Sequence, residues 1–193
     1  MKADAILRVT LALRDRLEAA RVSSTVPGSV FVGPLDDADA SGAALILFLY
    51  RVTPTPSLRN REHRVTTGGT PPVLVYRNAL PLDLYFLVTV GTMPGQSEET
   101  LLHALGSVLQ SLQAEPDLTG AGVGHETVRV TLEPLTVEES SRIWALFPTA
   151  NYRTSIAYVA TPVWIDPLAP EVTGAPVVDE QLFAGSGRVE VAP

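Results

Sequence analysis

The chain has no cysteine, which excludes disulfide bonds, thiol nucleophiles and cysteine-ligated metal sites. Lys2 is the only lysine, so arginine carries nearly all of the positive charge. Arginine is favoured where planar hydrogen-bonded pairing matters, as at protein interfaces, although a compositional bias of the genome gives the same usage. The formal net charge of −7 argues against binding to nucleic acid, because a phosphate backbone needs a basic face.

The chain also lacks a long apolar run. Its longest, residues 43–50, falls far short of the ~20 residues that a membrane helix needs. Arg8 and Arg14 interrupt the apolar positions near the N-terminus, so no signal-peptide core is present. We therefore expect a protein that is made in the cytoplasm and has no contact with membranes.

Motifs of catalysis and ligand binding are missing as well. The histidines His63, His103 and His125 show no metal-ligand spacing and are expected to be solvated surface residues. No nucleophile elbow and no phosphate loop occur. The glycine-rich residues 120–124 precede an expected strand, which is the wrong context for a dinucleotide site. The sequence predicts no catalytic residue, no cofactor and no metal, and hence no enzyme.

What the sequence does contain is enough apolar residues, 46% of 193, for a buried core in one domain. Apolar side chains recur at helical spacing over residues 4–20, where Asp4 is the expected N-cap. Ser97 is expected to cap a second helix that ends near residue 114. Thr136 and Glu139 have the spacing of a capping box and predict a short third helix.

Strand signals lie between these helices. Both alternating sets of side chains in residues 43–51 are apolar, which predicts a central strand covered on at least one face. Further strands are expected within the ranges 22–34, 73–76, 80–90, 128–132 and 154–165. Together these elements predict an α/β (α+β) fold in which about three helices pack on a single mixed, mostly antiparallel sheet.

Two other segments are candidates for contact with partners. Residues 52–72 combine prolines, which force an extended backbone, with arginines that are too polar for a core, so we expect a long exposed loop. From residue 167 onward, prolines and glycines leave only short apolar pieces. We therefore divide the chain into a domain, residues 1–166, and an extended C-terminal arm, residues 167–193. The expected interface residues are Pro54, Pro56, Leu58, Arg59, Asn60, Arg61, Arg64, Val177, Val178, Val189 and Val191.

Five segments in order resemble one known family. They are residues 49–60 (LYRVTPTPSLRN), 80–89 (LPLDLYFLVT) with the helix that begins near Glu98, 128–135 (VRVTLEPL), 138–144 (EESSRIW) and 152–158 (YRTSIAY). Over about residues 4–166 the chain resembles the N-terminal domain of cap (tail-terminator) proteins of phage-tail-like extracellular contractile injection systems. Each segment alone has little specificity, and the order of all five carries the resemblance.

The resemblance implies a structural role. Such caps form a six-fold homohexameric ring that ends the inner tube and anchors the last layer of the sheath. The resemblance implies a fold like that of tail terminators. It also implies that the chain contacts other copies of itself, the inner tube protein and the sheath protein, and no nucleic acid. From the resemblance we expect a particle that is assembled in the cytoplasm and either stays there or is released. Two alternatives stay open: another adaptor or baseplate-type interaction module of such a particle, and an enzyme whose site the sequence does not reveal. The arm is expected to donate a strand to a neighbouring sheet edge.

Overall fold

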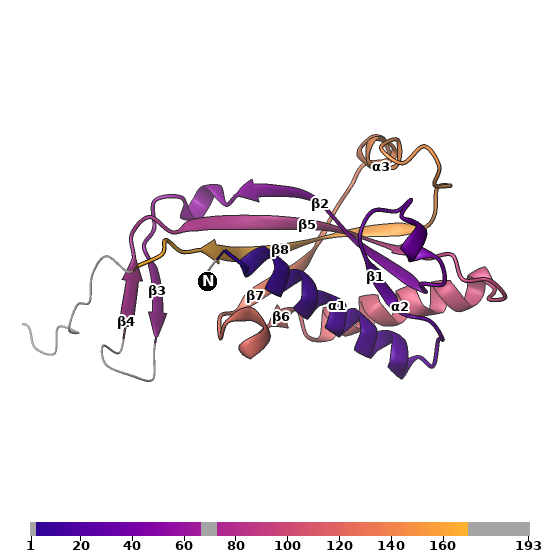
Figure 1. Cartoon of the computed structure of the whole chain (residues 1–193), viewed down its shortest axis with the longest axis horizontal. Helices are drawn as coiled ribbons and strands as arrows, with labels where there is room; N and C mark the ends of the chain where they lie inside the picture. The colour runs from indigo at the N-terminus through magenta and orange to yellow at the C-terminus, as the bar shows by residue number, and fades with distance from the viewer. Residues whose placement is uncertain (1–2, 67–72, 170–193) are drawn as a thin grey trace, which may run out of the picture.

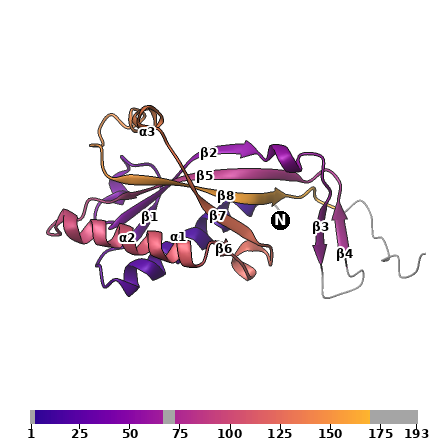
Figure 2. The same ribbon diagram turned by 180° about the vertical axis from the view of Figure 1, so that it is seen from behind.

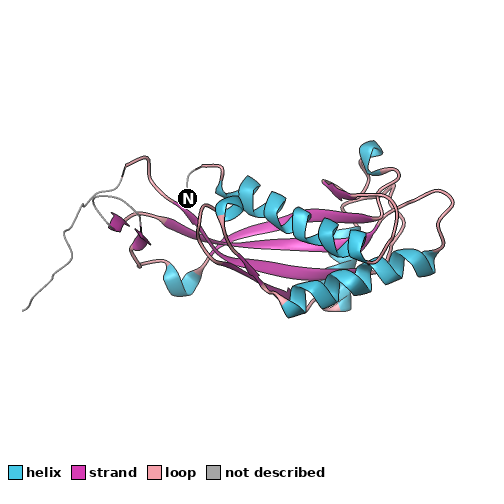
Figure 3. Cartoon of the chain, turned by 90° about the horizontal axis from the view of Figure 1, so that it is seen from below, coloured by secondary structure: helices cyan, strands magenta, loops and turns pink. Residues whose placement is uncertain are grey.

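The computed structural model describes residues 3–66 and 73–169. Helices α1 (Ala5–Ser23) and α2 (Glu98–Ala114) lie side by side on one face of a sheet (Figures 1 and 3). Both were predicted, and Ser97 caps α2 as expected by accepting a hydrogen bond from the backbone N–H of Thr100. Asp4 occupies the expected N-cap position of α1, but its side chain accepts no capping hydrogen bond and forms an ion pair with Arg8.

Within the described residues the sheet has six strands, in the order β1-β2-β5-β8-β7-β6. Only the pair β1–β2 is parallel; every other neighbouring pair in it is antiparallel, which confirms the mixed, mostly antiparallel sheet. Strand β6 was not predicted, since two residues give too little pattern. The bounds are β1 (Val30–Val32), β2 (Leu45–Pro54), β5 (Leu80–Val90), β6 (Asp117–Leu118), β7 (Val128–Glu133) and β8 (Ser155–Ile165).

Strand β2 is buried on both faces, as its sequence predicted. Leu45 and Leu47 belong to the larger core beneath α1 and α2. Ile46 belongs to a smaller core on the other face, which helix α3 (Val137–Trp144) covers in part through Ile143. The predicted capping box at the start of α3 is present. Alternating side chains of one central strand therefore join two cores.

Strands β3 (His63–Thr66) and β4 (Val73–Tyr76) pair with each other as a separate antiparallel hairpin. The hairpin stands at one end of the long sheet, and its strands run across the direction of β2, β5 and β8 (Figures 1 and 2). Strand β4 was predicted, but the expectation of an unbroken loop over residues 52–72 is wrong. The sequence of β3, His-Arg-Val-Thr, has a single apolar side chain and gives no strand signal by itself.

The predicted arm lies almost wholly outside the described residues, which end at 169. Val177, Val178, Val189 and Val191 fall beyond that point, and so does the strand that the arm is expected to donate. In residues 3–66 and 73–169, no helix combines the length and the apolar composition that crossing a bilayer requires.

Candidate interaction site: a hairpin held by a buried histidine

The structure gathers seven of the predicted interface residues on one segment, which joins β2 to the hairpin. Pro54 ends β2, Pro56 and Leu58 form a short 3-10 turn, and Arg64 lies in β3. Leu58 is half-buried, and the other six are exposed: Pro54, Pro56, Arg59, Asn60, Arg61 and Arg64. The contact of this segment with a partner stays a prediction.

The beginning of the segment is fixed to the sheet. Thr55, only 8% exposed, donates a hydrogen bond of 2.6 Å from its hydroxyl to Asp83 Oδ1 on β5. The hydroxyl of Thr161 on β8 donates to the same oxygen. A carboxylate that accepts from two hydroxyls makes stronger hydrogen bonds than a neutral acceptor does. One acidic side chain thus ties the exit from β2 to the next two strands of the sheet.

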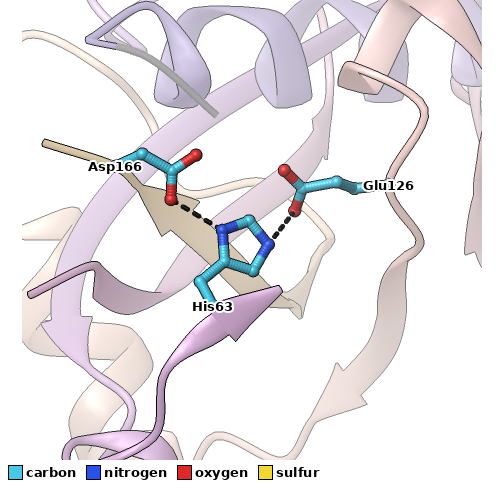
Figure 4. A group of neighbouring side chains, drawn as sticks. All are labelled: His63, Glu126 and Asp166. Carbon is cyan, nitrogen blue, oxygen red and sulfur yellow. Dashed lines mark hydrogen bonds and ion pairs between the residues drawn. The ribbon is translucent and has the colours of Figure 1, made fainter. Parts of the chain in front are cut away.

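The hairpin is fixed by His63, for which the expectation of a solvated surface residue is wrong. His63 is 7% exposed. Its Nδ1 lies 2.6 Å from Asp166 Oδ1, just beyond β8, and its Nε2 lies 3.4 Å from Glu126 Oε2, ahead of β7. The ring also stacks on Trp164, with centroids 4.6 Å apart and planes inclined by 6°. Figure 4 shows the two carboxylates at opposite sides of the imidazole. We call His63, Glu126 and Asp166 the histidine latch.

Electrostatics favour a positive imidazolium in the latch. Burial by itself lowers the pKa of His63, but Glu126 and Asp166 outweigh it, so the pKa is raised above its ordinary value. Burial likewise raises the pKa of Glu126, whereas the hydrogen bond and the charge of His63 are among the interactions that lower it; on balance the pKa of Glu126 is lowered. The side chains of Glu126 and Asp166 are only 13% and 7% exposed. Buried carboxylates need a positive partner, and the hairpin supplies it.

The latch is the set of described residues that could supply metal ligands, with ligand atoms within 4.8 Å of one another. An ion bound to one ring nitrogen lies about 2.1 Å from it, in the ring plane. His63, Glu126 and Asp166 offer one ligand atom each, which is the number of protein ligands in a catalytic zinc site. In the structure these groups are paired with one another.

The same geometry bears on catalysis. An imidazolium that donates from both ring nitrogens has no free lone pair with which to take a proton. The role that the latch can play is structural, because it joins the hairpin to Glu126, just before β7, and to Asp166, just after β8. Sequence reasoning missed Glu126, Trp164 and Asp166, because each is far from His63 in the chain and none stands in a recognisable motif.

Among the solved structures that match this fold, two are described as terminators or caps. The first is described as the sheath/tube terminator of the PVC extracellular contractile injection system in the extended state; its TM-score is 0.58, its identity is 16%, and the match covers 96% of this chain and 65% of that chain. The second is the tube-terminating cap of the anti-feeding prophage, with a TM-score of 0.57, 19% identity, and coverage of 90% and 60%. The chain thus spans less than two thirds of the length of either. A search of curated proteins found no match.

The fold is therefore that of tail terminators of contractile injection systems, as the sequence predicted. A protein-family model described as the Pvc16 N-terminal domain matches residues 8–179. Because that match spans most of the chain, the chain belongs to the Pvc16 N-terminal domain family.

Proposed function

We propose that this chain is a structural cap subunit of a contractile injection system. It forms a homohexameric ring that ends the inner tube and anchors the last sheath layer, and it has no catalytic role. The observation that carries the proposal is the family match over residues 8–179. The two solved terminators support it through their fold.

The physical character of the molecule agrees with such a role. The segment from Pro54 to Arg64, which joins β2 to the hairpin, is mostly exposed. It is fixed near its beginning by the hydrogen bond of Thr55 to Asp83 and near its end by the histidine latch. A surface that is already ordered loses little conformational entropy when a partner docks on it. Subunits of a ring contact each other through two different surfaces, so the chain needs at least two docking surfaces besides those for tube and sheath.

Imaging of particles made without this gene tests the proposal. We expect tubes that are overlong or open at the end, and a return to capped particles of uniform length when the gene is restored. Capped particles of normal length in its absence would overturn the proposal and favour an adaptor or baseplate-type role. We further propose assembly in the cytoplasm, which labelling of the chain in producing cells would test.

The arm enters the proposal as a strand donor. Residues 172–193 contain the strand-prone pairs around residues 177–178 and 189–191, and such pieces can add a strand to a neighbouring sheet edge. Deletion of residues 172–193 is expected to leave the domain folded and the particles without a firmly held cap. Particles that remain capped after this deletion would contradict the role of the arm.

A further inference from the structure

Charge is divided unevenly along the molecule. Residues 55–80, the hairpin with its flanking turns, contain four arginines and one glutamate, whereas the rest of the chain has ten basic and twenty acidic residues. An excess of one sign on a projecting element produces a local potential opposite to that of the whole protein. The hairpin is therefore a basic extension of an acidic molecule.

The positive groups of this extension are exposed. The side chains of Arg64 and Arg77 are 71% and 57% exposed, and both lie near Glu62, at 3.2 and 3.4 Å. Glu62 thus lies between two arginines and neutralises only part of their charge. Arg59 and Arg61 are exposed, and neither forms an ion pair with any residue that the structure describes. The four residues Arg59, Arg61, Arg64 and Arg77 are named here the arginine end.

Acidic side chains gather at the opposite end of the sheet. Strands β2 and β5 pair Pro54 with Leu82 beside the hairpin and Leu45 with Val90 at the far end. At the far end a bridge between Ser41 and Thr92 joins the loop before β2 to the loop before α2. Those two loops and the start of α2 carry five exposed carboxylates, here named the acidic end: Asp36, Asp37, Asp39, Glu98 and Glu99.

The two ends are too far apart to neutralise each other within one molecule. Strand β2 runs between them for ten residues, or about 30 Å at ~3.3 Å per residue. That separation is about three times the screening length of ~10 Å at moderate salt. Within the described residues none of the five carboxylates of the acidic end forms an ion pair, so the acidic end is open to a positive group from another molecule.

We infer that the arginine end of one copy docks on the acidic end of a second copy, so that copies associate head to tail. This inference deepens the proposed ring and rests on it. A contact between two different surfaces is the kind that closes a ring when the rotation between copies allows it. Pairing of like ends is disfavoured, because like charges across an interface repel. The histidine latch holds the arginine end in position before contact.

Two charge-reversed variants test the contact. Variant A carries Arg59→Glu and Arg61→Glu, so that both of its ends are negative. Variant B carries Asp39→Arg, Glu98→Arg and Glu99→Arg, so that only Asp36 and Asp37 remain negative at the acidic end and both ends of the variant are positive. None of the five exchanged side chains contacts another described side chain through a hydrogen bond or an ion pair, and unchanged melting temperatures will show that A and B fold. Arg129→Glu with Arg142→Glu, on β7 and α3, is the control with the same charge change as variant A.

Sedimentation of the full chain at low ionic strength is the measurement. We expect the wild type and the control to self-associate, and A or B alone to associate at least about tenfold more weakly because like ends then meet. An equal mixture of A and B should recover association, since the negative arginine end of A now fits the positive acidic end of B. Raising the salt from about 50 to about 500 mM should weaken wild-type association by screening.

Three results would overturn the inference: a wild type that stays monomeric at low salt, variants that associate like the wild type, or a mixture that does not recover. If A fails to associate with itself and with B but also loses binding to isolated tubes, the arginine end docks on the tube instead. None of these results tests the proposed cap role, which is tested separately by the length of tubes in particles made without the gene.

Discussion

His63 Nδ1 and Asp166 Oδ1 lie 2.6 Å apart although 103 positions separate the two residues in the sequence. The contact joins the first residue of β3 to the residue that follows β8. Because Asp166 directly follows β8, the same contact fixes the position of the hairpin relative to the end of that strand. The latch therefore couples β3 to the end of β8.

Removal of the imidazole should destabilise the protein strongly. His63→Gln removes the imidazole that lies between Glu126 and Asp166, and breaking a buried ion pair costs about 3 kcal/mol of unfolding free energy. Urea unfolding measures the change. His103→Gln on the exposed side of α2 is the matched control, with an expected change below about 0.5 kcal/mol. Equal stabilities of the two variants would show that the latch contributes nothing.

The contribution of the latch should depend on pH in both directions. The raised pKa of His63 means that its stabilisation is full below 6.5 and is lost as the pH rises through the pKa of the folded state. The lowered pKa of Glu126 means that its stabilisation is present above 4.5 and is lost as the pH falls through its folded value. The stability difference between the wild type and His63→Gln should therefore be largest from pH 4.5 to 6.5. A difference that grows toward alkaline pH would contradict this account.

Two glycines should respond in opposite ways to alanine. A Cβ on Gly91 would lie 1.9 Å from the carbonyl oxygen of Ala43, where backbone has to move, so Gly91→Ala should cost about 2–3 kcal/mol through overpacking. A Cβ on Gly106 in the exposed face of α2 meets nothing within 4 Å. Gly106→Ala should stabilise the protein by about 0.5–1 kcal/mol, since alanine is the better helix former. Thermal and urea unfolding of both variants check the sign of each change.

The hydrogen bonds that Asp83 accepts near the end of β2 should make a measurable contribution to the free energy of unfolding. Asp83→Ala removes the acceptor for the hydroxyls of Thr55 and Thr161 and should cost about 2–3 kcal/mol, as hydrogen bonds to a charged group do. Asp15→Ala, at an exposed position of α1, serves as the control. If Thr55→Ala and Asp83→Ala act through the same contact, the double variant will lose less stability than the sum of the two single variants.

The sequence revealed those parts of the fold whose signals are local. The Ser97 cap, the capping box at Thr136 and the doubly apolar residues of β2 each depend on neighbours within a few positions, and all three are present as predicted. Strand β3 depends on its partner β4 and on the packing of His63 against Trp164. A histidine in an arginine-rich segment is indistinguishable from a surface residue until its distant partners are known.

The candidate interaction site likewise has features that the sequence predicts and features that only the fold reveals. That the residues from Pro54 to Arg64 are mostly exposed followed from their composition, and the structure shows them so. That the arginines stand at one end of the sheet and the carboxylates at the other did not follow, because it depends on strand order and on the crossing of the hairpin. The signs of charge can be read from a sequence, but the distance between them requires the fold.

The short outer strands of the six-stranded sheet have a consequence for the life of the free subunit. Strand β1 has three residues and pairs with Leu45–Leu47 of β2. The rest of β2, from Phe48 to Pro54, therefore has an edge on that side that no other described strand covers. Open edges recruit further strands and lead to aggregation unless they are protected. A newly made subunit therefore carries backbone beside the hairpin on which another chain can add a strand.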